Sequence, residues 1–240
     1  SPTDPTAGFD HPALVAFLKA DPALFRIDTR TDIADLWQPD AAALHGLQDV
    51  WGVANPLMLT QWDALWESTG GRQSDRYDQL NVKYVLVRDG TPLPGGKFEL
   101  AFDAPDDLAV YRNLNFLPRA WLAAPSDDLD NFTPDPNTAP VTIDHYGSSG
   151  MTMQADSAVP AMLVLSEVWY PGWRATVNGE AAEIVRVNGG LRGVDVPAGA
   201  STVEMRFAPQ PWRWGLVLFG IGLVGLVVLL VMGWRRQTPG

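Results

Sequence analysis

The sequence predicts an α+β domain, then an antiparallel β-sandwich, then a single C-terminal transmembrane helix. Helical stripes precede strand-like runs in the first half of the chain, and seven β-rich runs crowd the part after residue 140. Residues 215–233 carry no charged side chain. We expect an α+β domain over residues 1–124, a proline- and aspartate-rich linker over 125–140, a sandwich over 141–209 and an anchor over 212–236.

The uncharged stretch 215–233 would form a helix roughly 28 Å long at about 1.5 Å per residue, close to the thickness of a bilayer's hydrocarbon core. Side chains that favour the membrane interface flank it on both sides: Trp212, Trp214, Trp234, Arg235 and Arg236. This pattern predicts one span that contacts the lipid bilayer. The adjacent Arg235 and Arg236 favour a cytoplasmic C-terminus, which would place the preceding domains outside the cytoplasm.

Within the predicted span, Gly220, Gly222 and Gly225 are small enough to let another helix approach closely. Glycine is also common in membrane spans generally. The predicted span could therefore pack against a partner helix or only tether the domains to the membrane. The chain begins Ser1-Pro2-Thr3 without an initiating methionine or an apolar signal segment. We therefore expect a processed N-terminus or a longer precursor.

The first domain opens with a short helix capped by Asp10, with Pro12 in its first turn, and residues 24–28 form a strand. A second helix starts at Asn55-Pro56 and stops at Gly70-Gly71. Ser74 caps a further turn. Strand-like runs then cover residues 82–87, 97–102, 108–112 and 119–123. We expect the helices to cover one face of an antiparallel sheet.

The region after the linker reads as a series of short strands separated by turn residues. Asn178-Gly179 separates two of them as a type I′ hairpin turn requires. Seven such strands in about seventy residues are typical of a β-sandwich. The strand-like runs are residues 141–145, 151–155, 161–168, 173–177, 183–187, 191–196 and 202–207.

Composition narrows the classes of function. The net charge of −11 over 240 residues argues against a basic surface that follows phosphates, so we expect no nucleic-acid partner. The absence of cysteine excludes disulfides, thiolate metal sites, iron–sulfur clusters and covalent haem attachment. We expect no cofactor. Apolar residues make up 46% of the chain, enough for a substantial core.

Several blocks of sequence together point to one family. Residues 166–175 read Ser-Glu-Val-Trp-Tyr-Pro-Gly-Trp-Arg-Ala, and further blocks lie at 55–57, 80–86, 117–120, 177–179, 196–199 and 204–209. They resemble the C-terminal extracytoplasmic region of YfhO-type bacterial membrane proteins. Members of that family are taken to be polytopic glycosyltransferases of the GT-C type that use lipid-linked sugars. Because this sequence has one span and no counterpart of the acidic loop said to carry catalysis, the resemblance implies fold and membrane side rather than activity.

Trp169, Tyr170 and Trp173 surround Pro171-Gly172 and are candidates for an aromatic platform that holds a glycan. Aromatic residues at a strand-turn-strand corner more often pack against the core, so both interpretations stand.

No set of residues in the sequence suggests catalysis or metal binding. His11, His45 and His145 lack the close spacing of metal ligands. The acidic linker residues lack the turn glycine and closing glutamate of a calcium-binding loop, which favours a solvated linker. These residues are Asp127, Asp128, Asp130 and Asp135.

The sequence therefore favours a non-catalytic, single-span accessory subunit in the bacterial cytoplasmic membrane, which scaffolds or stabilises a larger complex of membrane proteins. An energy-transducing electron-transport complex is a candidate host. Two alternatives are the C-terminal fragment of a GT-C-type glycosyltransferase that uses lipid-linked sugars, and a membrane-anchored carbohydrate-binding module.

Overall fold

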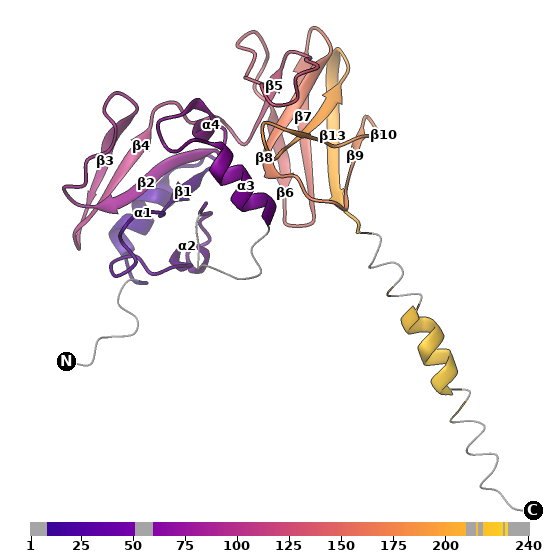
Figure 1. The fold of residues 1–240 in the computed structure, drawn as a ribbon, viewed down its shortest axis with the longest axis horizontal. Helices are drawn as coiled ribbons and strands as arrows, with labels where there is room; N and C mark the ends of the chain where they lie inside the picture. Colours follow the sequence, from indigo (N-terminus) through magenta and orange to yellow (C-terminus); the bar gives the residue numbers. More distant parts are fainter. Residues whose placement is uncertain (1–8, 51–59, 210–214, 216–217, 228, 230–240) are drawn as a thin grey trace, which may run out of the picture.

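The computed structural model describes residues 9–50, 60–209, 215, 218–227 and 229 (Figure 1). Two β-rich domains lie side by side, and the C-terminal helical segment extends away from the second one. The architecture is mostly antiparallel and sandwich-like with a few short helices, as the sequence predicts.

The first domain contains a four-stranded sheet in the order β1-β2-β4-β3. Its strands are β1 (Arg26–Asp28), β2 (Val82–Arg88), β3 (Phe98–Ala104) and β4 (Leu108–Asn113). We predicted an antiparallel sheet, but β1 pairs with β2 in parallel while the other pairs are antiparallel. The sheet is therefore mixed. A parallel partner needs a long crossover, which the helices between these two strands supply.

The helices of the first domain are short. They are α1 (Pro12–Ala20), α2 (Ala41–Leu44), α3 (Thr60–Ser68) and α4 (Asp75–Asp78). The residue that precedes α1 is His11, not the predicted Asp10, and no side chain caps this helix. Ser74 does cap α4, because its hydroxyl accepts a hydrogen bond from the backbone N–H of Tyr77. The predicted helix start at Asn55-Pro56 lies outside the described residues.

The second domain is a sandwich of two antiparallel sheets. The outer sheet has the order β10-β9-β13-β7-β6 and the inner sheet the order β11-β12-β8-β5. The Asn178-Gly179 turn joins β9 to β10, and both residues have positive φ, as a type I′ turn requires. The strands are β5 (Ala120–Ala123), β6 (Thr142–Tyr146), β7 (Gly150–Ser157), β8 (Ala161–Val168), β9 (Trp173–Val177), β10 (Glu180–Ala182), β11 (Val185–Val187), β12 (Leu191–Val196) and β13 (Gly199–Phe207).

The segment 119–123, predicted in the first domain, belongs to the sandwich instead. β5 pairs antiparallel with β8, with Trp121 opposite Val164. The chain therefore passes from one domain to the other between β4 and β5, before the proline-rich segment 125–140 rather than within it.

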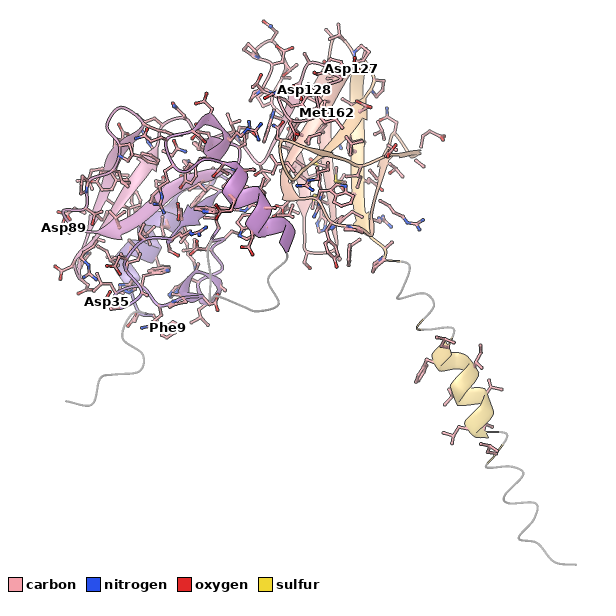
Figure 2. The ribbon with its side chains drawn as sticks, in the orientation of Figure 1. Phe9, Asp35, Asp89, Asp127, Asp128 and Met162 are labelled. Atoms are coloured by element: carbon pink, nitrogen blue, oxygen red, sulfur yellow. The ribbon has the colours of Figure 1, made fainter. Side chains whose placement is uncertain are left out.

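The sequence favoured a solvated linker over residues 125–140, but part of this connector packs against the domains. Phe132 is 1% exposed and joins the apolar core. Its backbone N–H donates to Oδ1 of Asn188, 2.8 Å away, and Nδ2 of Asn188 donates to the carbonyl of Phe132. The acidic Asp127 and Asp128 project from the outer end of the sandwich (Figure 2).

The inner sheet is buried on both faces. Ala161, Leu163 and Leu165 pack into the core of the sandwich, whereas Met162 and Val164 pack toward the first domain. Leu65 of α3 belongs to the same cluster as Met162 and Val164. A strand covered on both sides reads as a continuous apolar run, which explains the sequence Ala-Met-Leu-Val-Leu in β8. One apolar cluster thus spans the two domains, and each domain also has a cluster of its own.

After the sandwich, residues 218–227 are helical and carry exposed apolar side chains. Among the described residues, no helix has the length and apolarity needed to cross a membrane. Much of the predicted anchor 212–236 lies outside the described residues, including Trp212, Trp214, Trp234, Arg235 and Arg236.

Gly193 tests the packing of the inner sheet. A Cβ there would lie 2.8 Å from both Sδ of Met162 and Cγ1 of Val187. We expect Gly193→Ala to lower the free energy of unfolding by about 1–3 kcal/mol, because the core must shift to admit a methyl group. Urea unfolding followed by circular dichroism measures this. Gly95→Ala is the matched control, since nothing lies within 4 Å of its added Cβ, and an equal loss there would contradict the packing.

Candidate functional site

A cluster of charged side chains lies where the two domains meet, centred on Glu167 of β8. Oε1 of Glu167 accepts hydrogen bonds from Nη2 of Arg26 at 2.7 Å, Nη1 of Arg119 at 2.8 Å and the hydroxyl of Tyr146 at 2.5 Å. Arg119 is also held by Asn81 and Gln48, whose side-chain oxygens lie 2.8 and 2.7 Å from it. We call these six residues the Glu167 cluster.

The cluster draws on both domains. Arg26, Gln48 and Asn81 come from the first domain. Arg119 directly precedes β5, Tyr146 ends β6 and Glu167 lies near the end of β8. Charge-assisted hydrogen bonds are short and directional, so they fix the orientation of the domains more strictly than apolar contacts do.

Arg26 makes a second set of contacts across the junction. Its Nη1 donates to the carbonyl oxygens of Leu80 and Ser166, at 2.9 and 2.8 Å. The hydroxyl of Ser166 donates to the carbonyl of Gln79 at 2.6 Å. Because Ser166 precedes Glu167 in β8, two consecutive residues of one strand are bonded to the first domain.

Burial and charge oppose each other in this cluster. Burial by itself would raise the pKa of Glu167, but the positive charges of Arg26 and Arg119 outweigh it and hold the pKa below its ordinary value. Burial and the neighbouring Arg26 lower the pKa of Arg119, and burial and the charge of Glu167 raise the pKa of Tyr146. Glu167 is therefore an ionised acceptor at neutral pH and has no proton to donate there.

Arg192 lies close to this cluster on β12. Its Nε donates to the carbonyl of Val168 at 2.9 Å, and its guanidinium carbon stacks 3.8 Å from the centre of the Trp173 ring. The residue is 5% exposed, and its Nη1 has no hydrogen-bond partner among the described residues. Burial lowers its pKa to about 10 despite the favourable charge of Glu167.

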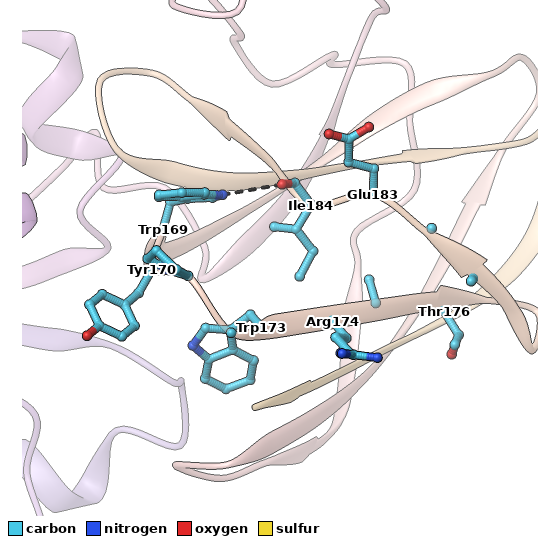
Figure 3. A pocket seen from close by; sticks show the side chains of 12 residues that line it. Trp169, Tyr170, Trp173, Arg174, Thr176, Glu183 and Ile184 are labelled. Atoms are coloured by element: carbon cyan, nitrogen blue, oxygen red, sulfur yellow. Dashed lines mark hydrogen bonds between the residues drawn. The ribbon is translucent and has the colours of Figure 1, made fainter. Parts of the chain in front are cut away.

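The aromatic residues singled out in the sequence do come together. Trp169, Tyr170 and Trp173 are each partly buried and line one end of an open pocket of about 560 Å³ (Figure 3). The indole N–H of Trp169 donates to the carbonyl of Ile184 at 3.3 Å, which ties this aromatic end to the opposite wall. The pocket has the volume of a small-molecule site.

The three glycines of the predicted span lie in the exposed helical segment. Nothing lies within 4 Å of a Cβ added at Gly220, Gly222 or Gly225, so their faces are open in the structure of this chain.

No group of His, Asp or Glu in the described part of the chain is arranged to hold a metal ion. Two of the histidines, far apart in the sequence, lie on the same side chain in the fold. The ring centres of His11 and His45 are 5.3 and 6.3 Å from that of Trp37. Their Nε2 atoms are bonded to the carbonyls of Leu36 and Phe9. These two histidines join segments of the first domain.

Comparison with known proteins identifies the second half of the chain. Residues 124–219 match the model of the family described as bacterial membrane protein YfhO. This part of the chain is similar to a YfhO-type region. No curated protein and no solved structure gave a match to the chain.

The sequence did not indicate Glu167 as a site residue, although the blocks that resemble the family contain it. Asn81, Arg119 and Glu167 come from three separate blocks, 80–86, 117–120 and 166–175, and the fold brings them into one set of hydrogen bonds. The sequence did hold one signal for this cluster, namely polar residues within otherwise apolar blocks. Such residues are expected to be buried, and a buried charge needs a partner.

Removing the charge of Glu167 should change both stability and its pH dependence. At neutral pH we expect Glu167→Gln to cost about 3–5 kcal/mol, because two buried arginines lose their counter-charge. The folded pKa lies below the unfolded one, so the wild-type stabilisation is present above the ordinary value of 4.5 and is lost as pH falls below it. The variant should lose less stability than the wild type on acidification below that value.

Urea unfolding at a series of pH values measures both effects. Glu99→Gln is the control, since Glu99 pairs with Arg112 on the surface, where such a pair contributes up to about 1 kcal/mol. Equal pH profiles for wild type and Glu167→Gln would contradict the role of the carboxylate.

Proposed function

We propose that this chain is a non-catalytic accessory module of a larger bacterial membrane complex. In this proposal the two domains stand on the extracytoplasmic side, residues 215–233 cross the cytoplasmic membrane, and the module scaffolds or stabilises its partners. An energy-transducing electron-transport complex is one candidate host. The Glu167 cluster carries the proposal, because its ionisable groups are engaged with one another in joining the two domains.

A scaffold must hold its domains in a fixed relation, and the junction has the features for this. The apolar core runs across it from Leu65 to Val164, and the Glu167 cluster adds directional bonds at its edge. These contacts suit two domains that keep one fixed orientation relative to each other.

The apolar side chains of the C-terminal helix are exposed, which supports the proposal that this helix contacts a membrane or another protein. Leu218, Phe219, Ile221 and Val224 are each at least 64% exposed. A contiguous apolar surface of this kind marks a contact with lipid or with another protein. The YfhO match extends to residue 219 and so includes the start of this segment.

The match to the YfhO family also favours a second candidate, the C-terminal region of a GT-C-type glycosyltransferase. Both candidates give these two domains a supporting role, but the second places catalytic spans in the same polypeptide. Reading the gene upstream of the codon for Ser1 separates them. Many apolar segments in the same open reading frame would establish the glycosyltransferase architecture, and their absence would exclude it.

Purification of the full chain in a mild detergent, followed by mass spectrometry, tests the scaffold role. We expect stoichiometric recovery of other membrane proteins. Recovery of the chain alone as a monomer would contradict the proposal.

The glycines of the apolar helix allow a sharper test. Replacing Gly222 and Gly225 with leucine should abolish partner recovery, because the new side chains hold a partner helix away while the helix stays apolar enough to insert. Carbonate extraction checks insertion, and partner recovery is measured in the same preparation. In a second variant, an unrelated apolar span replaces residues 215–233. If this variant recovers the partners as the wild type does, the interface lies on the two domains and not on the helix.

A further inference from the structure

The end of the sandwich from which the chain leaves β13 carries exposed aromatic surface. Phe207, the last residue of β13, is 37% exposed, and the centre of its ring lies 6.2 Å from that of the partly buried Tyr170. Trp173 packs against the core of the sandwich and against Phe207. We call this end of the sandwich, with Tyr170, Arg174, Arg206 and Phe207, the exit end. Aromatic side chains at such a place are typical of a surface that meets the headgroups of a membrane.

Two exposed arginines lie beside these rings. Arg206 of β13 is directly opposite Arg174 of β9 in the register of the outer sheet. Two carboxylates lie nearby, since Glu204 is 3.8 Å from Arg206 and Glu183 lines the same pocket as Arg174. The guanidinium groups are long and exposed, so they can reach lipid phosphates next to the aromatic rings.

The opposite end of the sandwich is acidic. Asp127 and Asp128 project there (Figure 2), and Asp156 lies at the end of β7, opposite Ala200 near the start of β13. All three aspartates are exposed. Phosphates repel such an end, so the charges of the sandwich favour the exit end as the one that faces a phospholipid surface.

The chain leaves the exit end along a fixed path. The backbone N–H of Ala208 donates to the carbonyl of Gly172, 2.7 Å away. A Cβ added at Gly172 would lie 3.2 Å from Cα of Pro209, so the chain is packed against this loop as far as Pro209. Six residue steps from Pro209 to Gly215 span at most about 22 Å when fully extended. The exit end is therefore within that distance of the start of the apolar stretch 215–233.

We propose that the exit end docks on the headgroup layer of a phospholipid bilayer, with Tyr170 and Phe207 among the headgroups and Arg174 and Arg206 bonded to lipid phosphates. The inference rests on the proposed function, because a helix that crosses the membrane at 215–233 holds the exit end close to the surface. A short connection raises the effective concentration of the surface, so contacts that are individually weak suffice for docking. Since the Glu167 cluster joins the two domains, docking sets the orientation of both.

Single-cysteine labelling tests the proposal. The chain contains no cysteine, so one introduced cysteine gives a unique site for a thiol-reactive fluorophore. Ser148→Cys places the label in the turn between β6 and β7 at the exit end, where the neighbouring Ser149 accepts a hydrogen bond from Phe207. Val159→Cys is the matched control at the opposite end, because Val159 is 56% exposed and follows Ser157, which pairs with Gly199 at the start of β13.

The full chain is reconstituted into vesicles of phosphatidylcholine and phosphatidylglycerol that contain a lipid with a nitroxide quencher on its headgroup. The nine residues of β13 span about 30 Å, whereas a headgroup layer is only about 5–8 Å thick. We therefore expect at least about threefold stronger quenching at position 148 than at position 159. Equal quenching at the two positions would overturn the docking.

A third label separates this result from the membrane span itself. Val224→Cys places the fluorophore in the apolar helix, where Val224 is 65% exposed, and a nitroxide on the lipid acyl chain should quench it. Quenching at 224 with equal quenching at 148 and 159 would overturn the docking and leave the span intact. Absence of quenching at 224 would overturn the span, and the labels at 148 and 159 would still decide the docking.

A charge reversal tests the role assigned to the arginines. Arg206→Glu should reduce the quenching at position 148 by at least about twofold, because lipid phosphates repel the new carboxylate. Lys19→Glu is the control, since it makes the same change in net charge at an exposed position of α1 and should leave the quenching unchanged. Equal quenching in both variants would overturn the contact of Arg206 with lipid phosphates.

Discussion

The relation between the two domains depends on one carboxylate. Arg26 and Arg119 are both buried, and each lowers its electrostatic cost by pairing with Glu167. A buried charge without a partner is far more costly than an unmade apolar contact, so an arrangement that separates these three groups is strongly disfavoured. These hydrogen bonds are directional, so they restrict rotation of one domain against the other more strictly than apolar contacts do. The charges therefore specify the geometry that the core stabilises.

β8 links these two kinds of interaction in a single strand. Its first five residues alternate between the core of the sandwich and the core shared with the first domain. Ser166 and Glu167 follow directly, where the strand reaches the edge of the shared core. The pairing of β8 with β12 shifts there, from Arg192 opposite Leu165 to Leu191 opposite Val168, so Ser166 and Glu167 lie at an irregularity of the strand. Both residues bond to the first domain.

Local patterns in the sequence were sufficient to predict most of the elements, but not all of their partners. The Asn178-Gly179 turn and the Ser74 cap involve residues close in sequence, so short-range chemistry fixes them. The partners of β1 and β5 are set by contacts across the whole chain: β1 pairs with a strand more than fifty residues later, and β5 pairs across the segment 125–140. The apolar content of residues 119–123 fits either sheet equally well. Phe132 was missed because a single buried side chain leaves no periodic signal.

Asn81 shows why the candidate site was harder to predict than the fold. It has a φ of +59°, a conformation that asparagine tolerates better than most residues, between α4 and β2. In this position its Oδ1 accepts from Nε of Arg119 and its Nδ2 donates to the carbonyl of Leu117. Asparagine combines that backbone conformation with both a donor and an acceptor, so one residue of the first domain fixes the segment that enters β5. Since β5 is an edge strand of the inner sheet, these hydrogen bonds from the first domain hold the segment that leads into one edge of the sandwich.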